Sequence, residues 1–176
     1  MELADAQGLM VRLLTDPAEL DRFLAVDSAT GSHAGFEGLD PSALARFASS
    51  LLAKRRGEVA KILPRTVKAL GRARFLELFR EHAASAPTEG TKRHRDDAIA
   101  FALSLKHANV SRWISDLARL EAFPLVLHQP GARWNALRLA FRPRDLMAWE
   151  SLPDQRPRTR PTLLIAFRGR VFQIPW

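Results

Sequence analysis

The sequence predicts an α+β protein: a mainly α-helical N-terminal domain over residues 1–129 and a small C-terminal domain over residues 130–176 with a three-stranded antiparallel sheet. Up to Phe123, apolar residues recur every three or four positions, as on one face of a helix. From Trp134 onward they alternate by two, the period of a strand, in short runs bounded by glycine and proline. Such a small sheet is stable only if one of its faces lies on the helical domain.

The composition bounds the class of protein. The chain has 176 residues, 47% of them hydrophobic, which is enough for one core and excludes a disordered chain. No apolar run approaches the roughly 20 residues of a membrane-spanning helix, and the start of the chain lacks the features of a secretory signal. Because cysteine is also absent, we expect a cytoplasmic protein.

The net charge of +8 comes mainly from arginine, since only five of the 27 basic residues are lysine. The excess is concentrated near the C-terminus, where residues 130–176 carry nine arginines against three acidic residues. Arginine forms forked hydrogen bonds with carboxylates and phosphates. We therefore expect an acidic or phosphorylated partner.

Two Asp-Pro pairs mark helix starts, because the aspartate accepts hydrogen bonds from first-turn amides and proline has no amide hydrogen to leave unpaired. They are Asp16-Pro17 and Asp40-Pro41. Between them, three glycines predict a loop that contains His33. The expected order is a helix over 3–14, a helix from Asp16, a loop over 26–39, and a helix from Asp40 that ends or bends near Gly57.

We expect the segments before and after the stretch from Arg55 to Phe79 to pack on it. Pro64 should end or kink the preceding helix, since proline lacks an amide hydrogen and disfavours helical geometry at Leu63. Gly71 suits the end of the short helix that follows, and a new helix begins after it. An ordinary corner between helices would show the same pattern.

Two further helices complete the predicted helical domain. One runs from about Asp96 to Ala108, with Leu103 among its mostly inward apolar residues, and the other begins after the cap Ser111 and ends at Phe123-Pro124. After them we expect strands over 134–142, 162–167 and 170–174, a helical turn near Leu146, and a stiff basic connector over 156–161.

Two blocks of these helices resemble a known family. They are RRGEVAKILPRTVKALGRARFLELF, from Arg55 to Phe79, and WISDLARLE, from Trp113 to Glu121. Together they are similar to the HvfC/BufC-like family of partner proteins (MbnC/TglI-like), which accompany multinuclear iron enzymes that modify ribosomally made peptides. The resemblance covers roughly half of the chain, from about Ala48 to Ala122.

The resemblance implies a non-catalytic subunit of natural product biosynthesis. It would form a heterodimer with a multinuclear iron enzyme of the MbnB/TglH type, through its helical domain, and would take the leader of a precursor peptide as an added strand. The iron would belong to the partner enzyme, so no cofactor is expected in this chain.

The residues themselves offer little catalytic chemistry. No phosphate-binding loop, nucleophile elbow or HExxH spacing is present, and there is no tyrosine. Glu81, Asp96 and Asp97 could converge on a metal with His82, His94 and His107. However, His82 and His94 flank a loop, and each is more simply a surface histidine. We therefore expect neither enzymatic activity nor a bound metal.

An exposed edge of the predicted sheet is the most informative feature, because it offers unpaired backbone groups to an extended peptide. Arginines beside that edge would attract an acidic leader, and neighbouring apolar residues would receive its side chains. The candidate peptide-binding residues are Arg138, Leu139, Arg142, Arg168, Arg170, Val171 and Phe172.

Three alternatives remain open from the sequence. The hairpin can simply close the core, with its arginines keeping the edge soluble. The protein can bind DNA, with phosphate contacts from basic helices, although Lys54-Arg55-Arg56 is more often a solvated helix end. An adaptor on an anionic membrane surface is the weakest alternative, since no helix combines a basic face with a broad apolar one. The basic residues that the DNA alternative uses are Lys54, Arg55, Arg56, Arg72 and Arg74.

Overall fold

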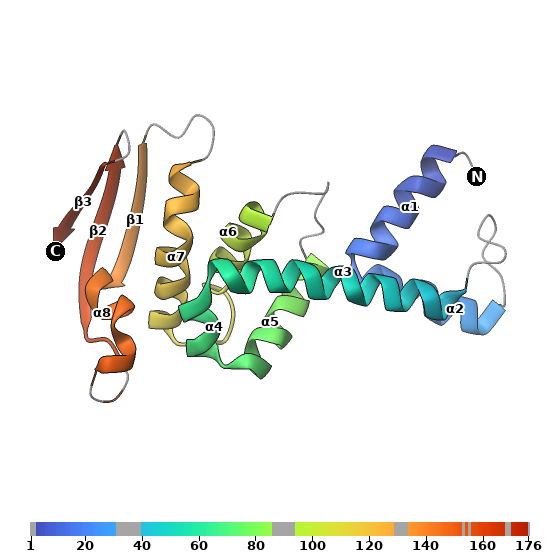
Figure 1. The fold of residues 1–176 in the computed structure, drawn as a ribbon, viewed down its shortest axis with the longest axis horizontal. Helices are drawn as coiled ribbons and strands as arrows, with labels where there is room; N and C mark the ends of the chain where they lie inside the picture. Colours follow the sequence, from blue (N-terminus) through green and yellow to red (C-terminus); the bar gives the residue numbers. More distant parts are fainter. Residues whose placement is uncertain are drawn as a thin grey trace. The chain divides into compact units, whose positions relative to one another are not determined.

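The computed structural model describes residues 3–30, 40–85, 94–128, 134–152, 154, 156–167 and 170–175. These residues form eight α-helices followed by a three-stranded antiparallel sheet, with α8 and a 3-10 turn between its first two strands (Figure 1). The predicted α+β fold class is confirmed. None of the described helices is both long enough and apolar enough to cross a membrane.

The chain divides into two compact units. The first consists of Met1–Glu58 and Leu76–Arg93, and the second of Val59–Phe75 and His94–Trp176. The sheet therefore belongs to the same unit as the last helices before it. The functional division predicted at residue 129, with partner binding by the helices and peptide binding by the sheet, stays a prediction.

The first unit contains α1 (Leu3–Thr15), α2 (Pro17–Thr30), most of α3 (Pro41–Ile62) and the second part of α5 (Arg72–Ser85). Both predicted Asp-Pro starts are confirmed. Asp16 accepts hydrogen bonds from the amides of Ala18 and Glu19, at 2.9 and 3.3 Å. Asp40 accepts bonds from the hydroxyl and amide of Ser42, and these bonds hold the pKa of Asp40 below its ordinary value of 3.8.

His82 on α5 lies in the core of the first unit, with 5% of its surface exposed. Its ring packs against Phe79, with ring centroids 5.9 Å apart. The interpretation of His82 as a surface histidine was therefore wrong. An imidazole ring has a flat apolar face, and the helical period that buries Phe79 also buries the residue one turn along.

The second unit contains α4 (Pro64–Leu70), the start of α5, α6 (His94–Ser104), α7 (Arg112–Leu127), α8 (Pro143–Met147) and a 3-10 turn at Trp149–Ser151. The predicted break around α4 is confirmed. The helix before it ends at Ile62, and Gly71 closes α4 with a φ of 75°, a conformation that favours glycine. The expected N-cap Ser111 stands at the start of α7, but its side chain makes no capping hydrogen bond.

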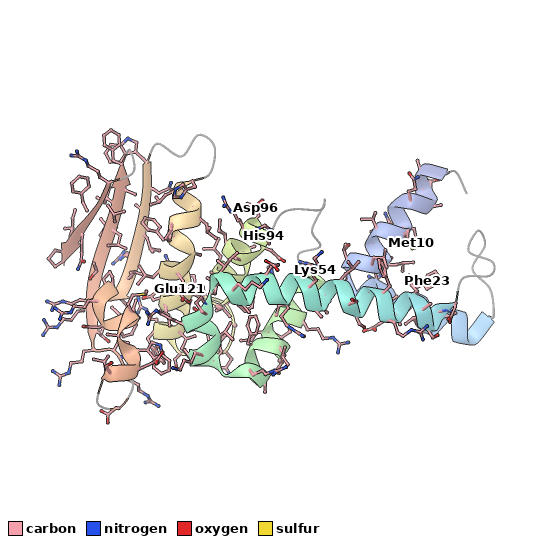
Figure 2. The ribbon with its side chains drawn as sticks, in the orientation of Figure 1. Met10, Phe23, Lys54, His94, Asp96 and Glu121 are labelled. Carbon is pink, nitrogen blue, oxygen red and sulfur yellow. The ribbon has the colours of Figure 1, made fainter. Side chains whose placement is uncertain are left out.

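Glu121 of α7, labelled in Figure 2, connects α4, in the stretch from Arg55 to Phe79, to the rest of the second unit. Its carboxylate accepts hydrogen bonds from the amide of Arg65 at 3.0 Å, and from the amide and hydroxyl of Thr66 at 2.8 and 2.6 Å. The Arg65 guanidinium also donates a hydrogen bond to the carbonyl of Met147, at 2.8 Å. The first turn of α4 is thus capped by a side chain from a distant helix.

Two predicted helix boundaries in the first unit were wrong. α3 passes through Gly57 without a break; a single glycine costs only about 1 kcal/mol in a helix interior. Consequently Lys54, Arg55 and Arg56 lie inside a helix and not at its end. α2 runs to Thr30, so residues 26–30 are helical where a loop was expected.

The remaining boundary corrections fall in the second unit. α7 continues beyond Pro124 to Leu127, where the helix tolerates the missing amide three residues before its end. α6 stops at Ser104, because the next amides bond in tight turns, such as His107 N to Ser104 O at 2.9 Å. Leu103 points outward with 56% exposure, whereas Phe101 and Leu105 are buried as expected.

The sheet has the order β1 (Trp134–Phe141), β2 (Thr159–Phe167) and β3 (Arg170–Pro175), with both neighbouring pairs antiparallel. β2 begins three residues earlier than predicted and includes Pro161. This proline falls where the β1–β2 register shifts, between the Leu139 and Phe141 pairs, so no regular ladder bond is lost there. The expected helical turn between these strands is confirmed as α8.

Candidate functional site

The two faces of the sheet are defined by its register. The inner face packs on α7 and α8, in a cluster that includes Leu137, Leu139 and Leu164 (Figure 1). Because side chains alternate along a strand, every second residue points the other way. This outer face consists of Trp134, Ala136 and Arg138 on β1, Leu163, Ile165 and Phe167 on β2, and Arg170, Phe172 and Ile174 on β3.

The outer face is mostly apolar and open. Trp134, Phe172 and Ile174 are 66%, 53% and 46% exposed, and the β2 residues between them are half-buried. Trp134 also packs on Phe167, with ring centroids 4.4 Å apart. Soluble proteins seldom leave a contiguous apolar surface without a binding role, so this face is the first component of the candidate site.

The strand β3 is the second component. It forms one edge of the sheet, and all six of its residues are exposed. Val171 points away from the outer face yet is still 50% exposed, so the helices that cover the inner face do not shield β3. An edge strand exposed on both faces can accept an added strand without moving any covering element.

The structure places the predicted site residues in three different environments. Arg170, Val171 and Phe172 lie together on β3, whereas Arg138 lies on the outer face of β1, at the opposite edge. Leu139 is 1% exposed and belongs to the core beneath the sheet, so it is not placed to form a surface pocket.

The other two predicted peptide-binding residues are Arg142 and Arg168. Arg142 precedes α8 and lines a pocket of about 360 Å³ together with three arginines of the segment before β2, Arg156, Arg158 and Arg160. Arg168 lies outside the described residues.

Sequence reasoning missed Trp134, Ile165 and Ile174 as candidate contact residues. The alternation of residues along the strands could have identified them, because they are apolar residues at the alternate positions that lie on the outer face. It was overlooked because both alternating sets of the predicted strands contain apolar residues, and the sequence does not say which set faces the helices.

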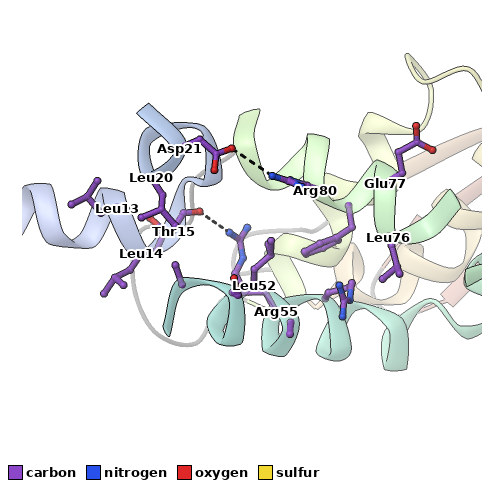
Figure 3. A pocket seen from close by; sticks show the side chains of 15 residues that line it. Leu13, Leu14, Thr15, Leu20, Asp21, Leu52, Arg55, Leu76, Glu77 and Arg80 are labelled. Carbon is purple, nitrogen blue, oxygen red and sulfur yellow. Dashed lines mark hydrogen bonds and ion pairs between the residues drawn. The ribbon is translucent and has the colours of Figure 1, made fainter. Parts of the chain in front are cut away.

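Some basic residues of the helices already contact other groups in their own unit, so fewer are available for phosphate contacts than the sequence suggests. In the first unit, Arg55 lies beside a pocket of about 590 Å³ with leucine-rich walls (Figure 3). Its guanidinium donates to the carbonyl of Thr15 at 3.3 Å and lies 5.9 Å from the centre of the Phe79 ring. In the second unit, Arg74 donates to the carbonyl of Asn109 at 3.4 Å. Lys54 and Arg72 are exposed.

A metal site is not evident in the described part of the chain. No group of three histidine, cysteine or acidic side chains lies close enough there to hold an ion. His94 and His107 are exposed, and His82 is buried against Phe79. His33 lies outside the described residues.

The described residues thus form an α+β protein whose sheet has an open apolar face and an exposed edge strand, β3. The family model for the SCO6045-like, C-terminal domain matches residues 34–107, less than half of the chain. The match agrees with a family relationship in the helical part and does not reach the sheet. No curated protein and no solved structure matches this chain.

Proposed function

We propose that this protein is a non-catalytic partner subunit that recruits the leader of a ribosomally synthesised precursor peptide by strand addition to β3. The observation that carries the proposal is the exposure of all six β3 residues at an edge of the sheet. The resemblance of the helices to HvfC/BufC-like partner proteins supports the same function. The enzyme served would be a multinuclear iron-dependent oxidase of the MbnB/TglH type.

Strand addition suits the chemistry of β3. The backbone of the leader would pair with the free edge, which gives affinity for many sequences. Apolar leader residues would lie beside Phe172 and Ile174 on the outer face, and acidic ones would be attracted to Arg170. A leader held in this way raises the effective concentration of the core peptide at the partner enzyme, without any catalytic group in this chain.

The first experiment asks whether the partner enzyme exists. A tagged form of the full chain is purified from its native host at physiological salt, and the eluate is analysed for protein stoichiometry and iron. We expect a heterodimer with an iron-containing protein. Recovery of nucleic acid without such a protein would support DNA binding instead, which predicts a steep fall of affinity with salt.

The second experiment tests the edge. Synthetic peptides covering short reading frames beside the gene are screened by fluorescence anisotropy, and the best binder is tested against Arg170→Glu and Phe172→Ser. We expect each variant to weaken binding about tenfold or more, as for the loss of a charge-assisted or buried contact. Arg12→Glu, an exposed site on α1 with the same charge change, is the matched control.

Backbone pairing has its own test. A peptide with alternate amides N-methylated keeps its side chains but cannot donate ladder hydrogen bonds, so it should lose binding when the methylated amides face β3. Methylating the other set of amides should have a much smaller effect. Equal effects from both sets would contradict strand addition.

A further inference from the structure

A second site lies on the other side of the same unit, beside β1. A pocket of about 600 Å³ opens there between the segment after α6, the first half of α7 and the middle of β1. Its polar lining consists of Lys106, Arg112, Ser115, Asp116, Arg119 and Arg138. Four of these side chains are cationic and one is anionic.

The one carboxylate in the pocket is already engaged. Asp116 is 4% exposed, and one of its oxygens accepts the amide of Ala140 at 2.6 Å. The other accepts the guanidinium of Arg119 at 3.1 Å. Ala140 lies where the β1–β2 register shifts, so its amide is bonded to α7 at an irregular point of the ladder. Asp116 therefore fixes the pocket wall, because it bonds both to β1 and to Arg119.

Three of the remaining polar groups are donors without a protein acceptor among the described residues. Among the described residues, Lys106 and Arg112 make no side-chain hydrogen bond or ion pair, and Ser115, only 5% exposed, has no partner for its hydroxyl. Arg119 is held by Asp116 with 23% of its side chain exposed, so its orientation is set before any ligand arrives. Lys106 and Arg112 are exposed, whereas Ser115 is buried, and a polar side chain in such a place ordinarily has a hydrogen-bond partner.

We infer that this pocket binds an oxyanion, a carboxylate or a phosphate group. The positive charges of Lys106 and Arg112 attract such a group, and an oriented arginine with a buried serine can hydrogen-bond its oxygens. The volume exceeds that of a lone carboxylate, so the group would be carried by a larger ligand. The carrier is an acidic side chain of a protein or a phosphorylated small molecule, which share this chemistry.

The site is independent of the proposed peptide edge, because β1 and β3 are opposite edges of the sheet. It can therefore be tested on the isolated full chain. Inorganic phosphate and succinate are each titrated into the protein at low salt, with binding followed by calorimetry and by the amide NMR shifts of residues 105–119. We expect saturable binding of at least one probe, with shifts at Ser115 and Arg119.

Variants distinguish a specific anion-binding site from nonspecific attraction by positive charge. The double variant Lys106→Gln with Arg112→Gln should weaken binding at least about tenfold, as for the loss of charge-assisted hydrogen bonds. The matched control, Arg12→Gln with Lys54→Gln, removes the same charge from exposed positions in the first unit and should change affinity less than about twofold. Arg119→Lys keeps the charge but loses the fork, and it should also weaken binding.

The outcomes are distinct. Preference for phosphate over succinate assigns a phosphorylated ligand, and the reverse preference assigns a carboxylate ligand. No saturable binding of either probe, or equal losses in the pocket and control variants, overturns the inference.

Discussion

The inner and outer faces of the sheet are built from similar residues but have different surroundings. Leu137, Leu139 and Leu164 point inward and are at most 6% exposed, because α7 and α8 cover them. Trp134, Phe172 and Ile174 point outward and are about half exposed or more. One apolar face suffices to anchor the sheet. The second face is therefore not needed to anchor the sheet.

The largest expected effect comes from breaking the inner face. Leu139→Ala removes a fully buried side chain and leaves a cavity beneath β1, so we expect a loss of about 2–5 kcal/mol in the free energy of unfolding. Urea denaturation followed by circular dichroism measures it.

The matched change on the outer face is Ile174→Ala, at a residue that is 46% exposed. We expect a loss below about 1 kcal/mol, because only about half of its surface leaves water on folding. Similar losses at the two positions would mean that the outer face is covered in solution, and size-exclusion chromatography would then reveal self-association.

The next effect concerns the polar anchor of the inner face. Asp116→Ala leaves the buried amide of Ala140 without its acceptor, and we expect a loss of about 1–3 kcal/mol. Asp116→Asn keeps an acceptor oxygen and should lose less. Hydrogen exchange at the Ala140 amide should be faster in the alanine variant, and unchanged exchange there would contradict the role given to Asp116.

A smaller effect is expected at Trp149, which packs against Trp113 with ring centroids 5.2 Å apart. Its indole nitrogen is buried without a hydrogen-bond partner among the described residues. Trp149→Phe should therefore remove no protein hydrogen bond and lower the free energy of unfolding by less than about 1.5 kcal/mol. A much larger loss would indicate that an ordered water bonds the indole nitrogen.

The smallest effect on stability per substitution is expected for Trp134→Ser with Phe172→Ser on the outer face. Unfolding should shift by only about 0.5 kcal/mol per site, as for most surface substitutions. Binding of an environment-sensitive apolar dye to the folded protein should nevertheless fall clearly, because the exposed rings are removed. Unchanged dye fluorescence would show that the outer face is not the accessible apolar surface.

Local rules predicted the sequence of elements well. Asp16 and Asp40 mark the helix starts, Pro64 and Gly71 bound α4, and the period of two locates β1. These signals depend on backbone geometry within a few residues. The same rules wrongly predicted that a helix ends or bends near Gly57, because a long helix tolerates a single glycine.

The candidate site depended on tertiary placement and was only partly predictable. Arg170, Val171 and Phe172 do share an open edge strand, as expected from a terminal hairpin. Leu139 was misplaced because the choice of inner face depends on where α7 lies. The role of Asp116 had no sequence signal at all, since its acceptor bond reaches a residue 24 positions away.

The capping of α4 by Glu121 also bears on how the chain folds during synthesis. A seven-residue helix is too short to persist alone in water. The carboxylate that bonds its first amides lies 55 and 56 residues later in the sequence. During synthesis, α4 can therefore be capped only after α7 has emerged from the ribosome. The middle of the chain thus completes its structure only once a much later segment has been made.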